Sequence, residues 1–258
     1  MALIAHLSDP HITTGPLAAE PAAGLYRALT RVLALEPRPD CVVITGDLAD
    51  RGEVGEYAAF RQILDHYPIP VHLAAGNHDR REPLLTTLGL SATTHVADHP
   101  GFSVVVLDSL APELADGGRL GAEQLDWLDR TLAERSGVPV FVGLHHPPVR
   151  VGIPGMDEIR LVDGDALAGV VARHPNVVRV LAGHLHRVVT AGFAGTTLTV
   201  APSTYRQVDL GMREGRPVGF VDEPAGFLLH WLDGDGAGAV CVTHTVPTSH
   251  TAAPVIAY

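Results

Sequence analysis

The chain has 258 residues, of which 46% are apolar, and it carries a formal net charge of -11. This size suits one large hydrophobic core, and the acidic balance excludes a protein that holds duplex nucleic acid by its phosphates. Two cysteines are too few for a disulfide framework. The first residues lack a basic leader and no apolar run is long enough to cross a bilayer, so we expect a cytoplasmic protein without a membrane span.

The first part of the chain alternates strand-like and helix-like segments. Short apolar runs at 3–7, 41–44 and 71–74 predict buried strands, and residues 22–35 and 57–64 have the apolar spacing of helices. Because a helix separates each strand from the next, we expect parallel strands with crossover helices.

The middle of the chain repeats this pattern. Strands are predicted at 104–107, 138–142 and 177–181. Helices are predicted over 165–173 and around the apolar face formed by Leu125, Leu128 and Leu132.

After residue 186 the chain consists of short β-like runs separated by turns, at 188–193, 196–200, 226–232 and 239–245. That end is predicted to be antiparallel. We expect a single domain, residues 1–258, in which the β-rich part from about 187 to 258 completes the second of two packed sheets.

Two long loops, 147–162 and 201–224, interrupt this organisation. Long loops in compact domains are often functional, although a solvated surface loop is as good an interpretation of either one.

Five polar motifs lie where apolar runs give way to loops. They read Asp9-Pro10-His11, Gly46-Asp47, Gly76-Asn77-His78-Asp79, His145-His146 and Gly183-His184-Leu185-His186. Loops at the carboxyl ends of strands bring distant residues together in α/β proteins, and carboxylate, amide and imidazole groups bind divalent first-row metals. Each motif alone is also an ordinary turn sequence. Their order and shared position predict a two-metal hydrolase centre.

Asp47 is the candidate bridge between the two metals, because a carboxylate can bind both at once. Asp9 and His11 can reach one metal only if the chain turns between them. The formal charges of the site sum to a single positive charge, when two divalent ions are counted with the carboxylates of Asp9 and Asp47 and one hydroxide. This net charge is complementary to a phosphodiester monoanion. A hydroxide nucleophile then needs no separate protein base.

The remaining motif residues complete this centre. His184 and His186, two apart in a segment expected to be extended, can serve neighbouring metals, and Asn77 and His145 can complete the second. His78 is free to protonate the leaving alkoxide or to stabilise developing charge.

Asp79 has two interpretations that the sequence does not separate. Its carboxylate can orient an imidazole, or it can cap the helix predicted to begin near Pro83.

The other histidines have simpler explanations, because neutral histidine is readily accommodated at half-buried positions. We interpret the following as structural or surface residues: His66, His72, His95, His99, His174, His230, His244 and His250. Cys41 lies within an apolar strand, where a buried thiol is the natural interpretation.

The motif set resembles the calcineurin-like metallophosphoesterase superfamily, whose blocks read D-x-H, G-D, G-N-H-D/E, H and G-H-x-H. The resemblance spans residues 9–186 and implies a four-layer α/β/β/α sandwich of two mixed sheets flanked by helices. It implies a first metal held by Asp9, His11, Asp47 and His186. It implies a second metal held by Asp47, Asn77, His145 and His184.

The stretches 45–52, 145–148 and 155–157 look like the class III cyclic nucleotide phosphodiesterases and the similar bacterial glycerophosphodiesterases. This resemblance implies hydrolysis of small phosphodiesters, with 3′,5′-cyclic nucleotides first. Residues 202–208 align with a substrate-facing stretch of that group, in which some members carry histidine at the position of Arg206.

Four residues are therefore expected to contact substrate. They are Asn77, His78, His146 and Arg206. His146, Met156 and Arg206 should lie near the part of the substrate beyond the phosphate, in a pocket walled by the two long loops. For Arg206, an ordinary surface position is an equally good interpretation.

Other functions of the same fold compete with this one. A glycerophosphodiesterase is the nearest alternative, and a phosphomonoesterase would use an extra cation such as Arg80. A non-catalytic scaffold is disfavoured, because it need not keep all seven ligands together with His78. An oxygen and imidazole site accepts manganese, iron, cobalt or zinc, and the resemblance implies a homodimer built partly through the β-rich tail.

Overall fold

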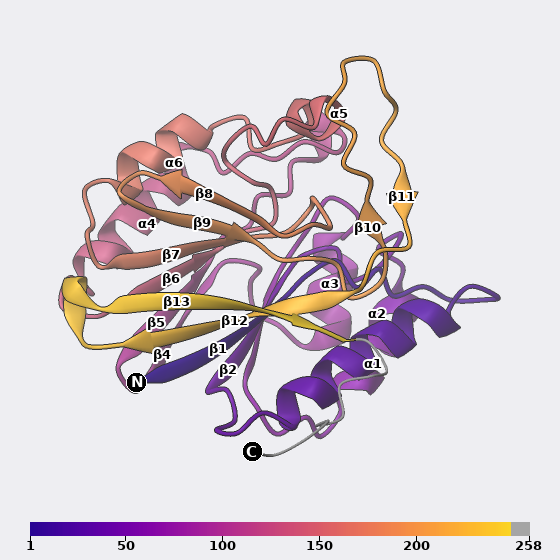
Figure 1. The fold of residues 1–258 in the computed structure, drawn as a ribbon, viewed down its shortest axis with the longest axis horizontal. Helices are drawn as coiled ribbons and strands as arrows, with labels where there is room; N and C mark the ends of the chain where they lie inside the picture. The colour runs from indigo at the N-terminus through magenta and orange to yellow at the C-terminus, as the bar shows by residue number, and fades with distance from the viewer. Residues whose placement is uncertain (249–258) are drawn as a thin grey trace, which may run out of the picture.

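The computed structural model describes residues 1–248, and His250 and the end of the expected β-rich tail lie outside this range. Two β-sheets pack face to face, with helices on their outer sides (Figure 1). The predicted four-layer α/β/β/α sandwich of two mixed sheets is confirmed.

The first sheet has the strand order β13-β12-β1-β2-β3. Its strands are β1 (Ala2–Leu7), β2 (Cys41–Thr45), β3 (Val71–Ala74), β12 (Gly226–Asp233) and β13 (Val240–Pro247). Strands β1, β2 and β3 are parallel to one another, whereas β12 pairs antiparallel with both β1 and β13.

The second sheet has the order β4-β5-β6-β7-β9-β8. Its strands are β4 (His95–His99), β5 (Phe102–Val106), β6 (Val140–Gly143), β7 (Val177–Ala182), β8 (Val189–Phe193) and β9 (Thr196–Val200). Strands β5, β6, β7 and β9 are parallel, and the outer strands β4 and β8 are antiparallel to their neighbours.

In residues 1–248, six α-helices connect these strands. They are α1 (Ala19–Leu33), α2 (Val54–Leu64), α3 (Arg81–Leu88), α4 (Ala122–Ala133), α5 (Pro154–Glu158) and α6 (Gly164–Val171). Helix α2 begins three residues earlier than the apolar spacing indicates, because Glu53 and Glu56 form a capping box. In residues 1–248 no helix is both long and apolar enough to cross a membrane.

Apolar side chains fill three interfaces between the four layers. Leu25 and Phe60 belong to the cluster between the first sheet and helices α1 and α2, and Leu128 and Val142 to the cluster under α4 and α6. Phe141 lies in the cluster between the sheets. Because all three interfaces are apolar, the four layers pack tightly and the parallel strands of the two sheets keep fixed positions relative to one another.

The β-rich tail differs from the sequence prediction. Strands β8 and β9 extend the second sheet as expected, but β12 and β13 return to the first sheet beside β1. Strand β9 is also parallel to β7 rather than antiparallel. The tail is therefore shared between the sheets, and β12 pairs the backbone groups that β1 would otherwise expose at an edge.

The two predicted long loops are partly ordered. Residues 147–162 contain the short helix α5, and residues 201–224 contain a two-stranded ribbon, β10 (Gln207–Val208) and β11 (Phe220–Val221). Figure 1 shows this ribbon rising beside α5, away from the two main sheets.

Candidate metal centre

Each predicted ligand motif lies just beyond the carboxyl end of a parallel strand. Asp9 follows β1, Asp47 follows β2, Asn77 follows β3, His145 follows β6 and His184 follows β7. Parallel strands in packed sheets bring these ends to one edge of the molecule. The motifs, far apart in sequence, therefore meet there.

One group of candidate ligands consists of Asp9, His11, Asp47 and His186. All four are buried, and their ligand atoms lie within 4.8 Å of one another. His11 Nε2 is 3.0 Å from His186 Nε2 and 3.4 Å from Asp47 Oδ2, and His186 Nε2 is 3.4 Å from Asp9 Oδ1.

A second group adjoins the first. The Oδ1 atom of Asn77 is 2.9 Å from His145 Nε2 and 3.0 Å from His184 Nδ1, and these two imidazole nitrogens are 3.2 Å apart. Asp47 Oδ2 lies 3.5 Å from His145 Nε2 and 3.4 Å from His11 Nε2. The Asp47 carboxylate therefore stands between the two groups.

The hydrogen bonds of these residues fit a metal centre. His145 Nδ1 donates to the Thr45 carbonyl at 2.7 Å, and His186 Nδ1 donates to the Arg206 carbonyl at 2.8 Å. In a neutral imidazole the other nitrogen then carries a lone pair. The lone pair on His145 Nε2 faces the lone pairs of Asn77 Oδ1, an arrangement that needs a cation or an additional proton between them.

Both carboxylates are held in the charged form. Burial alone would raise the pKa of Asp9, but the facing imidazoles, His186 first, hold it below its ordinary value. Burial opposes ionisation of Asp47 as well, and His145 and His11 lower its pKa. Charged carboxylates with converging imidazoles are suited to divalent ions.

The ligand loops use backbone conformations that are rare in regular structure. Positive φ angles occur at Asp9 (50°), His11 (45°), Asp47 (50°), His184 (70°) and His186 (46°). The expectation that the chain turns between Asp9 and His11 agrees with these angles. The expectation of an extended segment over His184 and His186 is wrong, because both residues have left-handed backbone angles. The turned backbone directs their side chains toward different groups of candidate ligands.

Gly46 makes this close approach possible. Its φ is +93°, and a Cβ at this position would meet the imidazole of His145 and the Cα of Gly76. A larger residue would displace a ligand from the second group.

Asp79 has neither of the two predicted roles. Its carboxylate accepts hydrogen bonds from the backbone N–H groups of Leu48, Ala49 and Gly76, and from the hydroxyl of Tyr57 at 3.0 Å. Burial, followed by the nearby Asp47, raises its pKa to about 6. Asp79 therefore ties the loop after β2 to the loop after β3.

His146 lies beside His145 and His184, with 4.8 Å between its ring centroid and each of theirs, and it does not line the cavity at the candidate metal centre, although a substrate contact was predicted for it. The side chain is fully buried, with Nδ1 2.8 Å from Ser109 Oγ and Nε2 3.0 Å from the Asp116 carbonyl. Both ring nitrogens are thus engaged within the protein. Sequence reasoning missed Ser109, although its place after the apolar run that forms β5 is the same signal that marks the ligand motifs.

A cavity of about 810 Å³ opens at the metal centre. It is lined by ligands from both groups, and by His78, Met156 and Arg206. His78 is exposed, its Nδ1 donates to the Asp50 carbonyl at 2.6 Å, and its ring is 4.6 Å from that of His11. Burial opposes protonation of His78, but Asp47 and the Asp50 carbonyl raise its pKa. It is therefore suited to carry a proton at the mouth of the centre.

Arg206 contributes to the site in two ways. Its carbonyl accepts from His186 Nδ1, and its guanidinium lies at the cavity rim, 3.6 Å from Glu20 and 4.8 Å from the ring centroid of Tyr205. The carbonyl contact was not predictable from the sequence, because any residue type supplies a carbonyl.

With this geometry in view, comparison with known proteins identifies the class. Residues 2–188 match the family model described as calcineurin-like phosphoesterase. The chain belongs to this family of metal-dependent phosphoesterases.

Two curated relatives extend over nearly the whole chain. A probable cyclic nucleotide phosphodiesterase of Synechococcus sp. is 36% identical over 242 residues, covering 90% of this chain and 93% of the relative. A probable glycerophosphodiester phosphodiesterase of Arcobacter nitrofigilis is 32% identical over 257 residues, covering 94% and 92%. The predicted enzyme class, a phosphoric diester hydrolase, is confirmed by these relatives.

A solved structure supports the fold independently. The dimetal phosphatase from Danio rerio superposes with a TM-score of 0.68 over 96% of this chain and 99% of that one, at 17% identity. At this identity the likeness concerns the fold alone.

Proposed function

We propose that the chain hydrolyses small phosphodiesters at a binuclear metal centre, with 3′,5′-cyclic nucleotides as the preferred class. The observation that carries this proposal is the position of Asp47, whose carboxylate oxygen is 3.4 Å from a nitrogen of one ligand group and 3.5 Å from a nitrogen of the other. The first metal is assigned to Asp9, His11, Asp47 and His186, and the second to Asp47, Asn77, His145 and His184.

Two divalent ions, such as manganese, iron, cobalt or zinc, would lower the pKa of bound water and offset the phosphate charge. The protein residues then orient the substrate. Asn77, a ligand of the second metal in this assignment, and His78 both line the cavity. His78 Nδ1 is held by the Asp50 carbonyl, which leaves Nε2 to give a proton to the leaving alkoxide.

The cavity walls favour a substrate with a large apolar part. They include a group of apolar side chains: Pro16, Leu17, Met156, Ile159, Val218 and Phe220. A nucleobase can bury its faces against such a surface, whereas glycerol offers mainly hydroxyl groups. This lining supports cyclic nucleotides, and the similarity to a glycerophosphodiester phosphodiesterase keeps that class as the second candidate.

The sequence argument for a phosphomonoesterase depended on Arg80 as an extra cation near the metals, and the position of Arg80 does not support it. Arg80 is exposed and packs against Gly52, and it does not belong to the cavity lining. The cytoplasmic location and the homodimer stay predictions.

A substrate panel tests the proposal. The enzyme, stripped of metal and reloaded with Mn²⁺, is assayed on cyclic AMP, cyclic GMP, glycerophosphocholine and glucose 6-phosphate. We expect kcat/KM to be highest for a cyclic nucleotide. A higher value for glycerophosphocholine would move the assignment to the second candidate, and a higher value for the monoester would overturn both.

A further inference from the structure

A second cluster of metal-binding side chains lies at the opposite end of the parallel strands. It consists of Cys41, His72 and His99, whose ligand atoms lie within 4.8 Å of one another. Cys41 is the first residue of β2, His72 lies near the start of β3, and His99 ends β4. The catalytic ligands lie beyond the other ends of β2 and β3, so the two clusters are separate.

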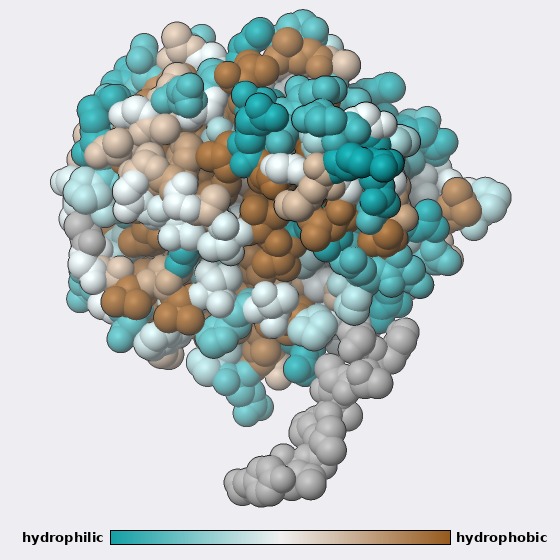
Figure 2. Space-filling model, turned by 45° about the horizontal axis from the view of Figure 1, so that its top comes forward, coloured by the Kyte–Doolittle hydropathy of each residue, from teal (hydrophilic) through white to brown (hydrophobic). Residues whose placement is uncertain are grey.

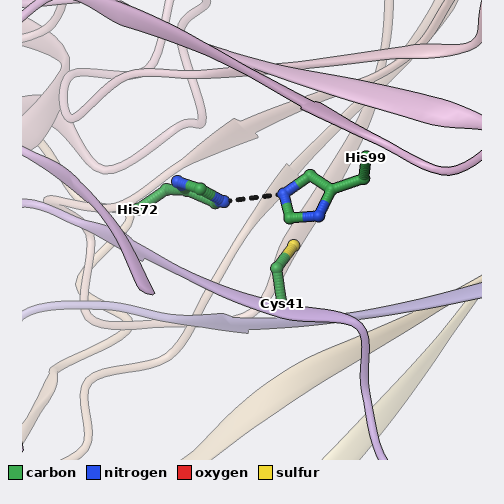
Figure 3. Close-up of side chains that lie close together, drawn as sticks. All are labelled: Cys41, His72 and His99. Atoms are coloured by element: carbon green, nitrogen blue, oxygen red, sulfur yellow. Dashed lines mark hydrogen bonds between the residues drawn. The ribbon is translucent and has the colours of Figure 1, made fainter. Parts of the chain in front are cut away.

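Figure 3 shows how these three side chains converge. The Nε2 atoms of His72 and His99 are 2.8 Å apart, and the sulfur of Cys41 points toward the His99 ring. Cys41 is completely buried, and His99 stacks on Phe102 with 4.7 Å between ring centroids. Three strands from both sheets thus supply one sulfur and two imidazoles to a single spot.

We propose that Cys41, His72 and His99 bind a zinc ion that ties the first sheet to the second. One thiolate and two imidazoles form a ligand set typical of zinc, whereas calcium and magnesium prefer oxygen. The catalytic centre offers only oxygen and nitrogen donors, so the two sites differ in the softness of their ligands.

The site needs little rearrangement to take the ion. The Nε2 atoms of His72 and His99 already face each other and the Cys41 sulfur points toward the His99 ring, so the three donor atoms converge. Burial raises the pKa of the Cys41 thiol, so the ion itself must displace the thiol proton. With zinc–nitrogen bonds of about 2.0–2.1 Å, the two nitrogens on a tetrahedral ion are about 3.3 Å apart. The imidazoles therefore separate slightly, the proton that one of them carries on Nε2 moves to its own Nδ1, and the thiol proton passes to solvent as the zinc–sulfur bond forms.

Solvent reaches the cluster at His99. This residue lines a cavity of about 620 Å³, together with Asp98, Arg135 and Pro139. Zinc would enter past His99, and a water molecule would complete the fourth position.

Cobalt substitution gives a test that the catalytic centre cannot imitate. The full-length protein is stripped with a chelator, reloaded with Co²⁺ and examined for the near-ultraviolet charge-transfer band of a cobalt–thiolate bond. None of the seven assigned catalytic ligands contains sulfur, so such a band reports only a cysteine site. We expect the band in the parent, because Cys41 then binds cobalt.

The chain offers a matched control, because its only other cysteine is Cys241. Cys41→Ser should lose the band and one equivalent of zinc, whereas Cys241→Ser should keep both. If Cys41→Ser fails to fold, His99→Gln at a partly exposed position provides the same test, and it should also lose one equivalent of zinc. Turnover of the phosphodiester should stay within about twofold in these variants.

Added zinc should raise the unfolding temperature of the parent more than that of His99→Gln, since binding to the folded state alone stabilises it. The absence of a cobalt–thiolate band in the parent would overturn the proposal. Full zinc content in His99→Gln would also overturn it, and would leave the cluster as a hydrogen-bonded histidine pair over a buried thiol. Neither result depends on which phosphodiester the catalytic centre hydrolyses.

Discussion

The two ends of the parallel strands gather candidate metal ligands by different means. At the carboxyl ends, Asp9, His11 and Asp47 lie in loops and have left-handed backbone angles. At the opposite end, Cys41 and His72 lie within regular strands and pair in register with Ile4 and Val43.

The difference follows from the geometry of a strand. Residues two apart on a strand point to the same side with their Cα atoms about 6.6 Å apart. Asp9 and His11 instead have left-handed backbone angles, which turn the chain at this position. Cys41, His72 and His99 come from separate strands, so the sheet pairing brings them together without such turns.

Apolar side chains also distinguish the two ends. Figure 2 shows brown, hydrophobic residues among teal, hydrophilic ones on one face of the molecule. The cavity at the candidate metal centre includes the apolar residues Leu17 and Phe220, which are 74% and 59% exposed. By contrast, the cavity beside His99 includes the charged residues Asp98, Glu134 and Arg135. The exposed apolar residues therefore lie at the end where we propose that substrate binds.

The largest effect is expected from Asp47→Ala. Because Asp47 lies between both ligand groups, this variant should lose both metals and fall to background turnover, at least ~10³-fold, which corresponds to several kcal/mol of charge stabilisation. Asp9→Ala should mainly weaken the first metal. Metal analysis of the folded variants, with turnover measured alongside, checks the difference. An Asp47 variant with two tightly bound ions and normal turnover would contradict the bridging role.

His78→Ala should keep both metals but slow the reaction, most for diesters with poor leaving groups. General acid catalysis is typically worth ~10²–10⁴-fold, and a stabilised phenolate needs little of it. The comparison is between bis(p-nitrophenyl) phosphate and an alkyl diester. Equal losses on both substrates would leave His78 with an electrostatic role only.

Gly46 and Gly101 have similar positive φ angles, so alanine at the two positions compares a steric clash together with backbone strain against backbone strain alone. Gly46 (φ +93°) approaches His145, whereas a Cβ at Gly101 (φ +86°), at the opposite end, would meet nothing within 4 Å. Alanine at Gly101 should cost about 1–2 kcal/mol of stability through backbone strain alone, and alanine at Gly46 should cost more, because its Cβ also meets His145. Gly46→Ala should also lower kcat by up to about 10²-fold through displacement of a ligand, and Gly101→Ala should not. Denaturant unfolding and steady-state kinetics of both variants provide the measurement; equal kcat values would show that the loop absorbs the added carbon.

Arg206→Ala should have the smallest effect. The guanidinium is at the cavity rim, so its loss should raise KM by about tenfold or change the ranking of diesters, while the backbone contact with His186 remains. Arg216→Ala provides the control, because Arg216 lies in the same loop region but pairs with Asp209. Identical kinetics for the two variants would make Arg206 an ordinary surface residue.

The sequence by itself determined the parallel α/β core and the positions of the ligand motifs. Short apolar runs such as 41–44 are typical of buried strands, and the polar residues directly after them then lie at the strand ends. Residue chemistry also indicated the kind of metal centre, because carboxylates and imidazoles bind metals wherever the fold gathers them. These properties depend on local pattern, which a sequence contains.

Only the tertiary structure decided which residues contact one another across the fold. The roles of Asp79 and His146, and the return of β12 to the first sheet, depend on backbone N–H groups, carbonyls and strand edges. Every residue type supplies these groups, so no sequence pattern marks them. The sequence pattern likewise indicated His72 and His99 as isolated structural histidines. Only the pairing of the strands brings them beside Cys41.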